Sequence, residues 1–457
     1  MNAVKSANYT KVKVQELQRT LYLAAKASNK RRFHALYDKV YRTDVMWEAW
    51  KRVKANRGSA GIDGVTIQHI VQEYGEERFV MDVQRQLVEN LYHPKPVRRR
   101  DIPKGDGKTR PLGIPIIQDR LVQMATKIVL EAIFEADFKD CSFGFRPKRS
   151  AKQAVERIHK TVNYGRVYWV VDVDIAGYFN NIPHDKLLKL VEQRVSDRRV
   201  LKLIRQWLKA GVMEDGQVHN TEIGSPQGGV ISPLLANIYL NYLDTLWEKQ
   251  FSHIGTLVRY ADDLVILCEN KPHAMEAIQV LKAVFRKLEL TMNTNKSKLV
   301  NLWLDKEGFD FLGFHHRRMP KLFKSGKFYD LRSIPSKKAM KKMRDKVKEV
   351  TAPRARLYWS PKQMVDKLNP VIQGWKNYYG SVDPGMSNKF LLKVDWHIIR
   401  RLTLYWNKKH KRNQLHPRRV AEVLGRMGLK RVCAWGSYTA QGEEHRKAVC
   451  GKTARTV

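Results

Sequence analysis

Three aspartates lie among apolar residues in a chain that is otherwise strongly basic. Asp174 falls in the apolar run 167–175, and Asp262 and Asp263 interrupt the apolar run 256–267. A buried carboxylate is unfavourable unless it is paired or bound to a metal ion. Two hard cations held by carboxylates can stabilise both the attacking and the leaving oxygen of a phosphoryl transfer. These residues therefore predict a nucleotidyl transferase or a nuclease.

The composition indicates a polyanionic partner. The 457 residues include 85 Lys and Arg against 45 Asp and Glu, so the formal net charge is 85 − 45 = +40. Nucleic acid is the common partner that neutralises such a charge. Hydrophobic residues make up 43% of the chain, which excludes wholesale disorder. The four cysteines form no C-x-x-C unit, so we expect neither a zinc ribbon nor a disulfide framework.

The hydrophobic pattern predicts the elements that position the three acids. Residues 167–175 predict a strand with Asp172 and Asp174 on one face, and 256–267 predict a hairpin with Asp262 and Asp263 at its turn. A basic hairpin is expected at 97–102 and 108–114, and a further strand at 309–314. Helices are expected at 13–55, 77–91, 119–136, 184–210, 233–250 and 274–288. Strands and helices in this order favour an α+β domain that ends at about residue 332.

A small helical domain is predicted after that point. Residues 336–350 and 390–407 carry apolar stripes at helical spacing. Between them, Asn369 followed by Pro370 is typical of an N-cap and a first helical residue, and Gly380 would end that helix. From Lys408 onward the chain is a basic tail.

Several motifs surround the acids in a fixed order. They are Lys104 to Gly113, Asp174 to Phe179, Gly224 to Asn237, Tyr260 to Asp263, Leu290 to Ser297 and Phe311 to Gly313. Their order and spacing resemble the reverse transcriptases encoded by group II introns, of the type that lacks an endonuclease domain. The resemblance covers about residues 17–411. It implies a right-hand polymerase whose fingers and palm contain an antiparallel sheet, followed by an α-helical thumb or maturase domain.

The resemblance also implies four domains. Residues 1–75 would be an N-terminal extension and 76–332 the fingers and palm. Residues 333–410 would be the thumb or maturase domain, and 411–457 a basic segment expected to bind DNA. The chain lacks a Cys/His-rich endonuclease pattern, so we expect no cleavage of the second DNA strand. Asn180 and Asn181 replace an acid that many members carry after the motif of Phe179.

The catalytic residues implied by the resemblance are Asp174, Asp262 and Asp263. These three and the backbone carbonyl of Ile175 would bind two Mg²⁺ ions, which Mn²⁺ could replace. Asp172 could tune the site, although a solvent-facing or hydrogen-bonded role is the stronger expectation.

Five residues are implied to bind the incoming nucleotide. Lys104 and Arg110 would grip the triphosphate, with Lys108 as the competing lysine. Phe179 would exclude a 2′-hydroxyl, while its neighbour Tyr178 packs in the core. Gln227 would touch the nucleotide or template. Lys296 would be either a general acid for pyrophosphate or a plain phosphate contact.

Nucleic-acid contacts are implied in two further places. Asn56, Arg57 and Gly58 would belong to a loop against the template. Phe311 and Gly313 would belong to the primer grip, and Lys376 would face outward from a thumb helix. Trp375 and Tyr379 lie on the apolar stripe of that helix, so we expect them in the core.

The function implied is that of an RNA-directed DNA polymerase, a nucleotidyltransferase with a two-metal mechanism. It would also be a maturase that assists splicing and target-primed retrohoming. Expected partners are intron RNA as template, a DNA primer or target and dNTPs, with no membrane, and a monomer or dimer on RNA. The expected location is a bacterial cytoplasm, or an organelle in a eukaryote. Two alternatives stay open: a maturase that only binds RNA, and a free-standing relative used in repair, CRISPR adaptation or phage defence.

Overall fold

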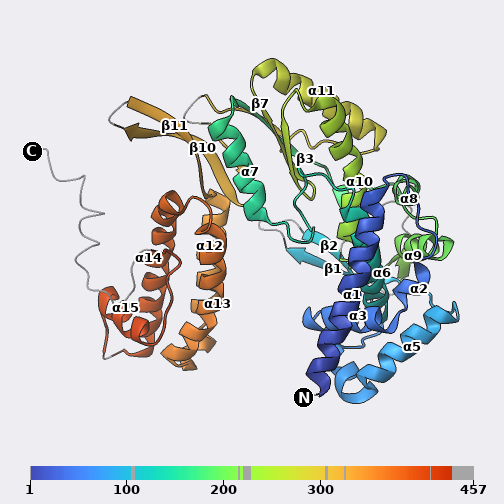
Figure 1. The fold of residues 1–457 in the computed structure, drawn as a ribbon. Helices are drawn as coiled ribbons and strands as arrows, with labels where there is room; N and C mark the ends of the chain where they lie inside the picture. The colour runs from blue at the N-terminus through green and yellow to red at the C-terminus, as the bar shows by residue number, and fades with distance from the viewer. Residues whose placement is uncertain are drawn as a thin grey trace, which may run out of the picture. The chain divides into compact units, whose positions relative to one another are not determined.

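The computed structural model describes residues 2–103, 109–214, 217–219, 228–303, 307–323, 326–411 and 413–434. Its contacts divide the chain into two compact units, each treated by itself below (Figure 1). Unit 1 comprises Met1–Ser150 and Val171–Leu299, and unit 2 comprises Ala151–Val170 and Val300–Val457. The sheets consist mainly of antiparallel strand pairs, and together with the many helices they confirm the predicted α+β class. None of the helices in these ranges is long and apolar enough to cross a membrane.

The helices of unit 1 surround one central helix, α6, which is buried along most of its length. Helices α1, α2, α3 and α10 contact α6, which explains why most of its side chains are buried, the polar Asp119, Arg120 and Gln123 included. The helices are α1 (Asn2–Ala27), α2 (Tyr37–Val40), α3 (Thr43–Ala55), α4 (Ile67–His69), α5 (Glu76–Val88), α6 (Ile117–Glu135), α8 (His184–Glu192), α9 (Arg198–Lys209), α10 (Ser232–Leu246) and α11 (Lys271–Lys287). Short helical turns of other types are η1 (Ile70–Tyr74), η2 (Tyr178–Asn180) and η3 (Trp247–Phe251).

The predicted basic hairpin is confirmed. Strands β1 (Val97–Pro103) and β2 (Thr109–Ile114) pair antiparallel, from Arg98 opposite Ile114 to Pro103 opposite Thr109. Residues 104–108, where the sequence predicts the turn, lie outside the described residues. The hairpin belongs to a sheet of order β2-β1-β4-β5, with β4 (Val212–Glu214) parallel to β1 and β5 (Gln217–His219) at the far edge.

A second sheet carries the three acids and has the order β6-β7-β3-β8. Strands β6 (Thr256–Tyr260) and β7 (Asp263–Cys268) form the predicted hairpin, in which Tyr260 pairs with Asp263. Strand β3 (Trp169–Asp174) lies between β7 and β8 (Lys298–Asn301). The sheet therefore sets the end of β3 beside the strand that begins with Asp263.

Unit 2 begins with α7 (Ala151–Tyr164), which contacts a three-stranded sheet of order β11-β10-β9. The prediction of one strand over 309–314 is wrong. Strand β9 (Phe309–Phe311) ends at a turn in which Leu312 and Gly313 have φ of 51° and 79°, and the chain then reverses into β10 (Phe314–Phe323). Strand β11 (Gly326–Pro335) completes a long hairpin that the hydrophobic pattern did not predict.

The predicted helical domain is present, with one helix start misplaced. Its elements are α12 (Lys337–Thr351), η4 (Arg354–Tyr358), α13 (Pro361–Tyr379), α14 (Pro384–Lys409) and α15 (Pro417–Arg426). The prediction that a helix begins at Asn369-Pro370 is wrong, because α13 begins at Pro361 and Pro370 lies inside it. Ser360 is the N-cap and forms a capping box with Gln363. Gly380 follows the helix as predicted, but with an ordinary φ of −78°.

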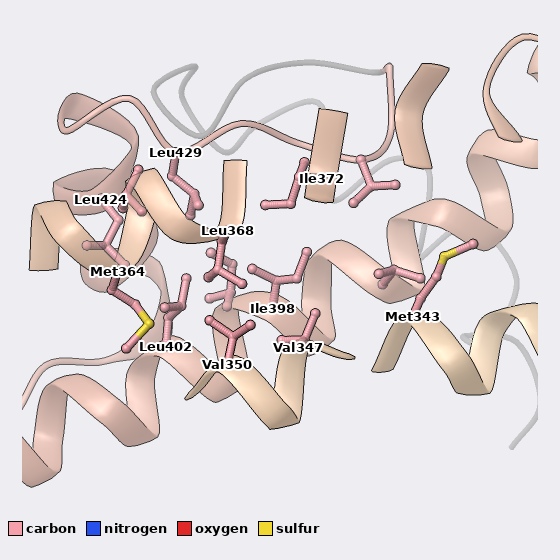
Figure 2. Packing of buried hydrophobic residues seen from close by; sticks show 14 of the residues in the cluster. Met343, Val347, Val350, Met364, Leu368, Ile372, Ile398, Leu402, Leu424 and Leu429 are labelled. Atoms are coloured by element: carbon pink, nitrogen blue, oxygen red, sulfur yellow. The ribbon is translucent and has the colours of Figure 1, made fainter. Parts of the chain in front are cut away.

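An apolar core joins the helices of this domain (Figure 2). Leu368, Ile372, Ile398 and Leu402 are among its fully buried members. Trp375 and Tyr379 are partly buried against it, in agreement with the prediction.

The core extends past residue 410, where the sequence suggested a basic tail. Leu424, Leu429 and Cys433 belong to the same cluster. Asp395 of α14 accepts hydrogen bonds from the backbone N–H groups of Val432 and Cys433, at 2.8 and 3.0 Å. The first part of the expected tail is therefore packed as part of the helical domain.

Candidate active site

Asp174 is the last residue of β3 and is held by the segment that precedes β8. Its backbone N–H donates to Ser297 Oγ at 3.2 Å, and its carbonyl accepts from the Asn293 N–H at 2.8 Å. Its carboxylate accepts from Asn293 Nδ2 at 3.0 Å and from Lys296 Nζ at 3.3 Å. The chain thus fixes both the backbone and the side chain of Asp174.

Asp262 lies in the tight turn between β6 and β7, and Asp263 is the first residue of β7. Ala261, the first residue of the turn, has φ of 57°, in the left-handed region that L-residues seldom adopt. Gly144 lies directly against this turn, because a Cβ at that position would come within 2.4 Å of the Ala261 nitrogen. The close approach explains why a glycine stands there.

A fully buried arginine supports the same turn. Arg259 Nη1 donates to the carbonyl oxygen of Ala261 at 2.9 Å and to Asn237 Oδ1 at 3.1 Å. Its Nε donates to Asp244 at 2.8 Å, and its Nη2 donates to Ser142 Oγ at 2.8 Å. Arg259 and Asp244 both have 0% exposed side chains. Burial lowers the pKa of Arg259, but the charge and hydrogen bonds of Asp244 outweigh that effect and raise it.

The three acids influence one another electrostatically. Burial raises the pKa of Asp262, and the charge of Asp174 adds to the increase, while Arg110 and Arg259 oppose it. Asp263 is exposed to solvent as a residue. Desolvation of its carboxyl group by the surrounding protein, together with the charges of Asp262 and Asp174, nevertheless raises its pKa to about 6. Mutual repulsion of this kind is relieved when a divalent cation lies between carboxylates.

The structure therefore brings the acids close enough to interact but does not form a complete ion cage from them. Within the described ranges, no group of three or more His, Cys, Asp or Glu side chains is arranged to hold a metal ion.

The segment after Asp174 presents one aromatic ring and buries the next. Tyr178 is 2% exposed and donates its hydroxyl to the Ala236 carbonyl at 2.6 Å, as expected of a core residue. Phe179 is half-buried and meets the Tyr178 ring edge-on at 5.4 Å. Ile175 is buried and forms a β-bridge with Met292. Anchoring of Tyr178 thus restricts the position of Phe179.

The predicted nucleotide-binding residues are only partly described. Arg110 is exposed on β2 and lies close enough to Asp262 and Asp263 for its charge to oppose the rise in the pKa of both. Lys296 has a side chain that is 63% exposed and pairs with Asp174. Lys104 and Gln227 lie outside the described residues.

The predicted template loop is fixed against α6. Asn56 follows α3, and Arg57 has φ of 47°. Gly58 lies beside the guanidinium of Arg120, which donates to the backbone carbonyls of Ser59 and Pro115. The described contacts of this loop therefore anchor it to α6.

The remaining predicted contacts lie in unit 2. Phe311 is 2% exposed in β9. A Cβ on Gly313 would lie 3.0 Å from the Tyr379 hydroxyl, so the turn is pressed against α13. Lys376 is half-buried on α13 rather than fully outward. The buried position of Phe311 indicates that its ring supports the turn instead of facing solvent.

Sequence reasoning missed the residues that hold the acids. Arg259 lies in an apolar strand and Asp244 in an apolar helix, and each was treated as part of its hydrophobic pattern. The available signal was the charge itself, because a charged residue is almost never fully buried unless it is paired.

Comparisons with known proteins match two parts of the chain to known families. Residues 102–316 match the family model "Reverse transcriptase (RNA-dependent DNA polymerase)", and residues 340–422 match "Group II intron, maturase-specific domain". The chain is 32% identical to Protein YkfC of Escherichia coli over 363 residues, which is 71% of this chain and 93% of that protein. It is 41% identical to the group II intron-encoded protein LtrA of Lactococcus lactis over 213 residues, which is 46% of this chain and 35% of LtrA.

The chain belongs to the group II intron reverse transcriptases and maturases. A nuclear intron maturase 1 of Arabidopsis thaliana is also similar, at 34% identity over 95 residues, 21% of this chain and 13% of that protein. The matches span only about a third of LtrA and half of an uncharacterised 91 kDa cob intron protein of Schizosaccharomyces pombe. The chain thus contains both domains of the family. The activities of the full-length relatives are assigned to this chain only as proposals.

Proposed function

We propose that this chain is an RNA-directed DNA polymerase that binds two Mg²⁺ ions at Asp174, Asp262 and Asp263. The observation that carries the proposal is the placement of these acids. Two adjacent strands bring them together, burial and their mutual repulsion raise the pKa of Asp262 and Asp263, and a cation, Lys296, already pairs with Asp174. Carboxylate oxygens are the ligands that Mg²⁺ prefers.

The donor set has the chemistry that Mg²⁺ prefers, because it consists of carboxylate and carbonyl oxygens. Asp174 and Asp262 would supply ligands, with the Ile175 carbonyl as a further oxygen and Asp263 as support. When bound, such ions activate a 3′-hydroxyl and neutralise the charge that develops on a phosphoryl group. Mn²⁺ presents a similar preference for oxygen and would substitute.

The residues around the acids would orient the substrates. Arg110 can form a bidentate contact with a triphosphate, and Lys296 can contact phosphate as a point charge. The half-buried Phe179, fixed by Tyr178, would contact the sugar and exclude a 2′-hydroxyl. These roles would account for dNTPs as substrates, and we propose intron RNA as the template and a DNA end as the primer.

A second function is supported by a separate observation. The match to the maturase-specific domain covers α12 to α15, whose elements pack around one apolar core. We propose that this domain binds intron RNA and assists splicing, and that both activities together permit target-primed insertion of the intron.

The polymerase is tested by dNTP incorporation on poly(rA)/oligo(dT) with and without Mg²⁺. Asp174→Asn and Asp262→Asn should each lower kcat about a thousandfold, because each removes several kcal/mol of charge stabilisation. Asp185→Asn, at an exposed aspartate of α8, is the matched control and should retain activity. Incorporation that is unchanged in Asp262→Asn would contradict the proposal.

The maturase function is tested by splicing of a group II intron RNA at low Mg²⁺. We expect Asp262→Asn to assist splicing as well as the unaltered chain, because RNA binding does not require the catalytic acids. A chain that synthesises DNA but never accelerates splicing would contradict this second function alone.

A further inference from the structure

The outward face of α9 carries positive charge without any negative charge. Arg198, Arg199, Lys202, Arg205 and Lys209 are all exposed, and α9 contains no Asp or Glu. Lys202, Arg205 and Lys209 follow one another at spacings of three and four residues, which places them along one side of the helix. Like charges at this spacing destabilise a helix unless a partner neutralises them.

Two other helices pair at least one of their cations with an acid of the same helix. Arg85 pairs with Asp82 in α5 at 3.0 Å, and Lys362 pairs with Asp366 in α13 at 2.9 Å. Among the residues that the structure describes, Lys202, Arg205 and Lys209 form no ion pair or hydrogen bond. An ordinary solvated face would interleave both signs.

The same three cations border a hollow in the surface. Its volume is about 310 Å³, and its lining is completed by His93, Pro94, Gln206 and Ala210. Gln206 lies 3.3 Å from His93 Nδ1, which joins α9 to the segment before β1. No acid is among the lining residues, so the hollow concentrates positive charge.

Helix α9 is held rigidly beneath this face. Its N-cap, Asp197, is buried and accepts from the N–H groups of Arg199 and Val200, and also from those of Leu36 and Tyr37 at 2.8 Å. Trp207 on the opposite face is buried and donates to the Tyr92 hydroxyl at 2.9 Å. A rigid array of cations loses little entropy when it binds an anion.

We infer that the α9 hollow binds the phosphodiester backbone of a nucleic acid through Lys202, Arg205 and Lys209. The site shares no residue with the proposed catalytic set, and its test does not require polymerisation. A phosphate backbone suits the site because it supplies successive anions that can follow the cations along the helix.

The test uses the full chain carrying Asp262→Asn, so that binding is measured whether or not the chain polymerises. Affinity for labelled oligo(rU) is measured against salt for this chain and for the triple variant Lys202→Gln, Arg205→Gln, Lys209→Gln. Each neutralised single-strand phosphate contributes about 0.7 to the slope of log affinity against log salt, so the triple variant should lose about 2 from the slope.

A matched triple variant carries Lys282→Gln, Arg286→Gln and Lys287→Gln on α11, with the same residue types and the same change of charge. It should lose clearly less of the slope, and thermal unfolding should be similar for both variants because all six residues are exposed. An equal loss of salt slope in the two variants would overturn the α9 site, because it would show that only the net charge of the chain matters.

Two measurements together identify the nucleic acid that occupies the site. The α9 triple variant is also made with Asp262 intact, and its KM for poly(rA)/oligo(dT) is measured. An unchanged KM with weakened oligo(rU) binding assigns the site to RNA outside the primer–template, and a parallel rise of KM assigns it to the primer–template. Both results support the site. Retained oligo(rU) affinity and salt slope overturn it.

Discussion

Two regions stabilise the protein in opposite ways: the polar framework behind the turn between β6 and β7, and the core of the helical domain. Behind the turn, Arg259 and Asp244 are fully buried charges, bonded to Asn237, Ser142 and the Ala261 carbonyl. The helical domain instead buries an apolar cluster whose members include Leu368, Ile398 and Leu402 (Figure 2).

The two kinds of core differ in how strictly they specify geometry. Apolar packing is non-directional, so side chains of similar volume replace one another at small cost. A buried ion pair is directional, and removing one partner leaves an uncompensated charge in a low dielectric. The polar framework lies behind Asp262 and Asp263, the acids proposed to bind Mg²⁺, and in that role their positions would have to be exact to a fraction of an ångström.

The largest effect is expected when the ion pair is broken. Arg259→Met should lower the free energy of unfolding by about 3–5 kcal/mol, because Asp244 then remains buried and unpaired. The double variant Arg259→Met, Asp244→Leu should recover most of that stability, since apolar side chains of similar volume can replace a buried pair. Denaturant unfolding measures both values.

The double variant also separates positioning from stability. It leaves the Ala261 carbonyl without its buried donor, so we expect a low kcat for dNTP incorporation even though the chain is folded. Its oligo(rU) affinity should be unchanged. A double variant with full kcat would show that Arg259 stabilises the fold and does not position the turn.

The second prediction compares conservative substitutions in the two regions. Leu402→Ala should cost about 2–5 kcal/mol through the cavity it leaves, whereas Leu402→Met should cost less than about 1.5 kcal/mol. Arg259→Lys keeps the charge but loses the planar fork that reaches several acceptors, so it should cost more than Leu402→Met. The comparison fails if Arg259→Lys is the milder of the two by denaturant unfolding.

The sequence predicted the parts of the fold that follow from periodicity and short-range signals. The strand ending at Asp174 and the hairpin at Asp262 and Asp263 are confirmed, because both depend on alternating apolar residues and a tight turn. The three acids were recognised by their charge within those strands. Arg259 was not, because its partner Asp244 is distant in sequence and the pairing depends on tertiary structure.

The wrong helix start has a similar cause. Ser360-Pro361 and Asn369-Pro370 are both typical of an N-cap followed by proline, and sequence alone does not choose between them. In the structure Asn369 serves a tertiary role: its side chain donates to the Gly428 carbonyl at 2.9 Å and accepts from the Lys430 N–H at 2.9 Å. The segment that supplies these groups was predicted to be a tail, so the contact could not be anticipated.

Another buried polar residue of unit 1 carries a carboxyl group. Asp119 of α6 is 1% exposed and accepts from the Tyr92 hydroxyl at 2.7 Å and the Lys95 N–H at 3.0 Å. Burial raises its pKa from 3.8 to about 7. Between these values the folded chain retains a proton that the unfolded chain has lost, so its contribution to stability is complete below about pH 4 and is lost as the pH rises towards 7.

Comparing the free energy of unfolding of the unaltered chain with that of Asp119→Asn measures the contribution of this proton. The stability advantage of the unaltered chain should fall with pH across that window by at most about 1.4 kcal/mol per pH unit, the value for one proton. Urea unfolding at several pH values measures it. A difference that does not depend on pH would mean that Asp119 is ionised throughout.

The smallest effect is expected at the cap of α13, where the apolar domain relies on a local polar signal. Ser360 Oγ accepts from the Gln363 N–H at 3.2 Å, and Gln363 Oε1 accepts from the Ser360 N–H at 2.7 Å. Ser360→Ala should lower the free energy of unfolding by about 1 kcal/mol, while Ser360→Asp should retain the cap. Denaturant unfolding of the two variants gives the difference.

Asn369→Ala provides the matched comparison, because it removes the other residue with the sequence signature of a cap. If Asn369 acts only through Gly428 and Lys430, Asn369→Ala should loosen the segment that follows α15 and increase amide hydrogen exchange at Val432 and Cys433. Ser360→Ala should instead increase amide hydrogen exchange in the first turn of α13. The reverse pattern would restore Asn369 as the start of the helix. The two variants thus distinguish a local signal that begins a helix from the same residue types recruited for a tertiary contact.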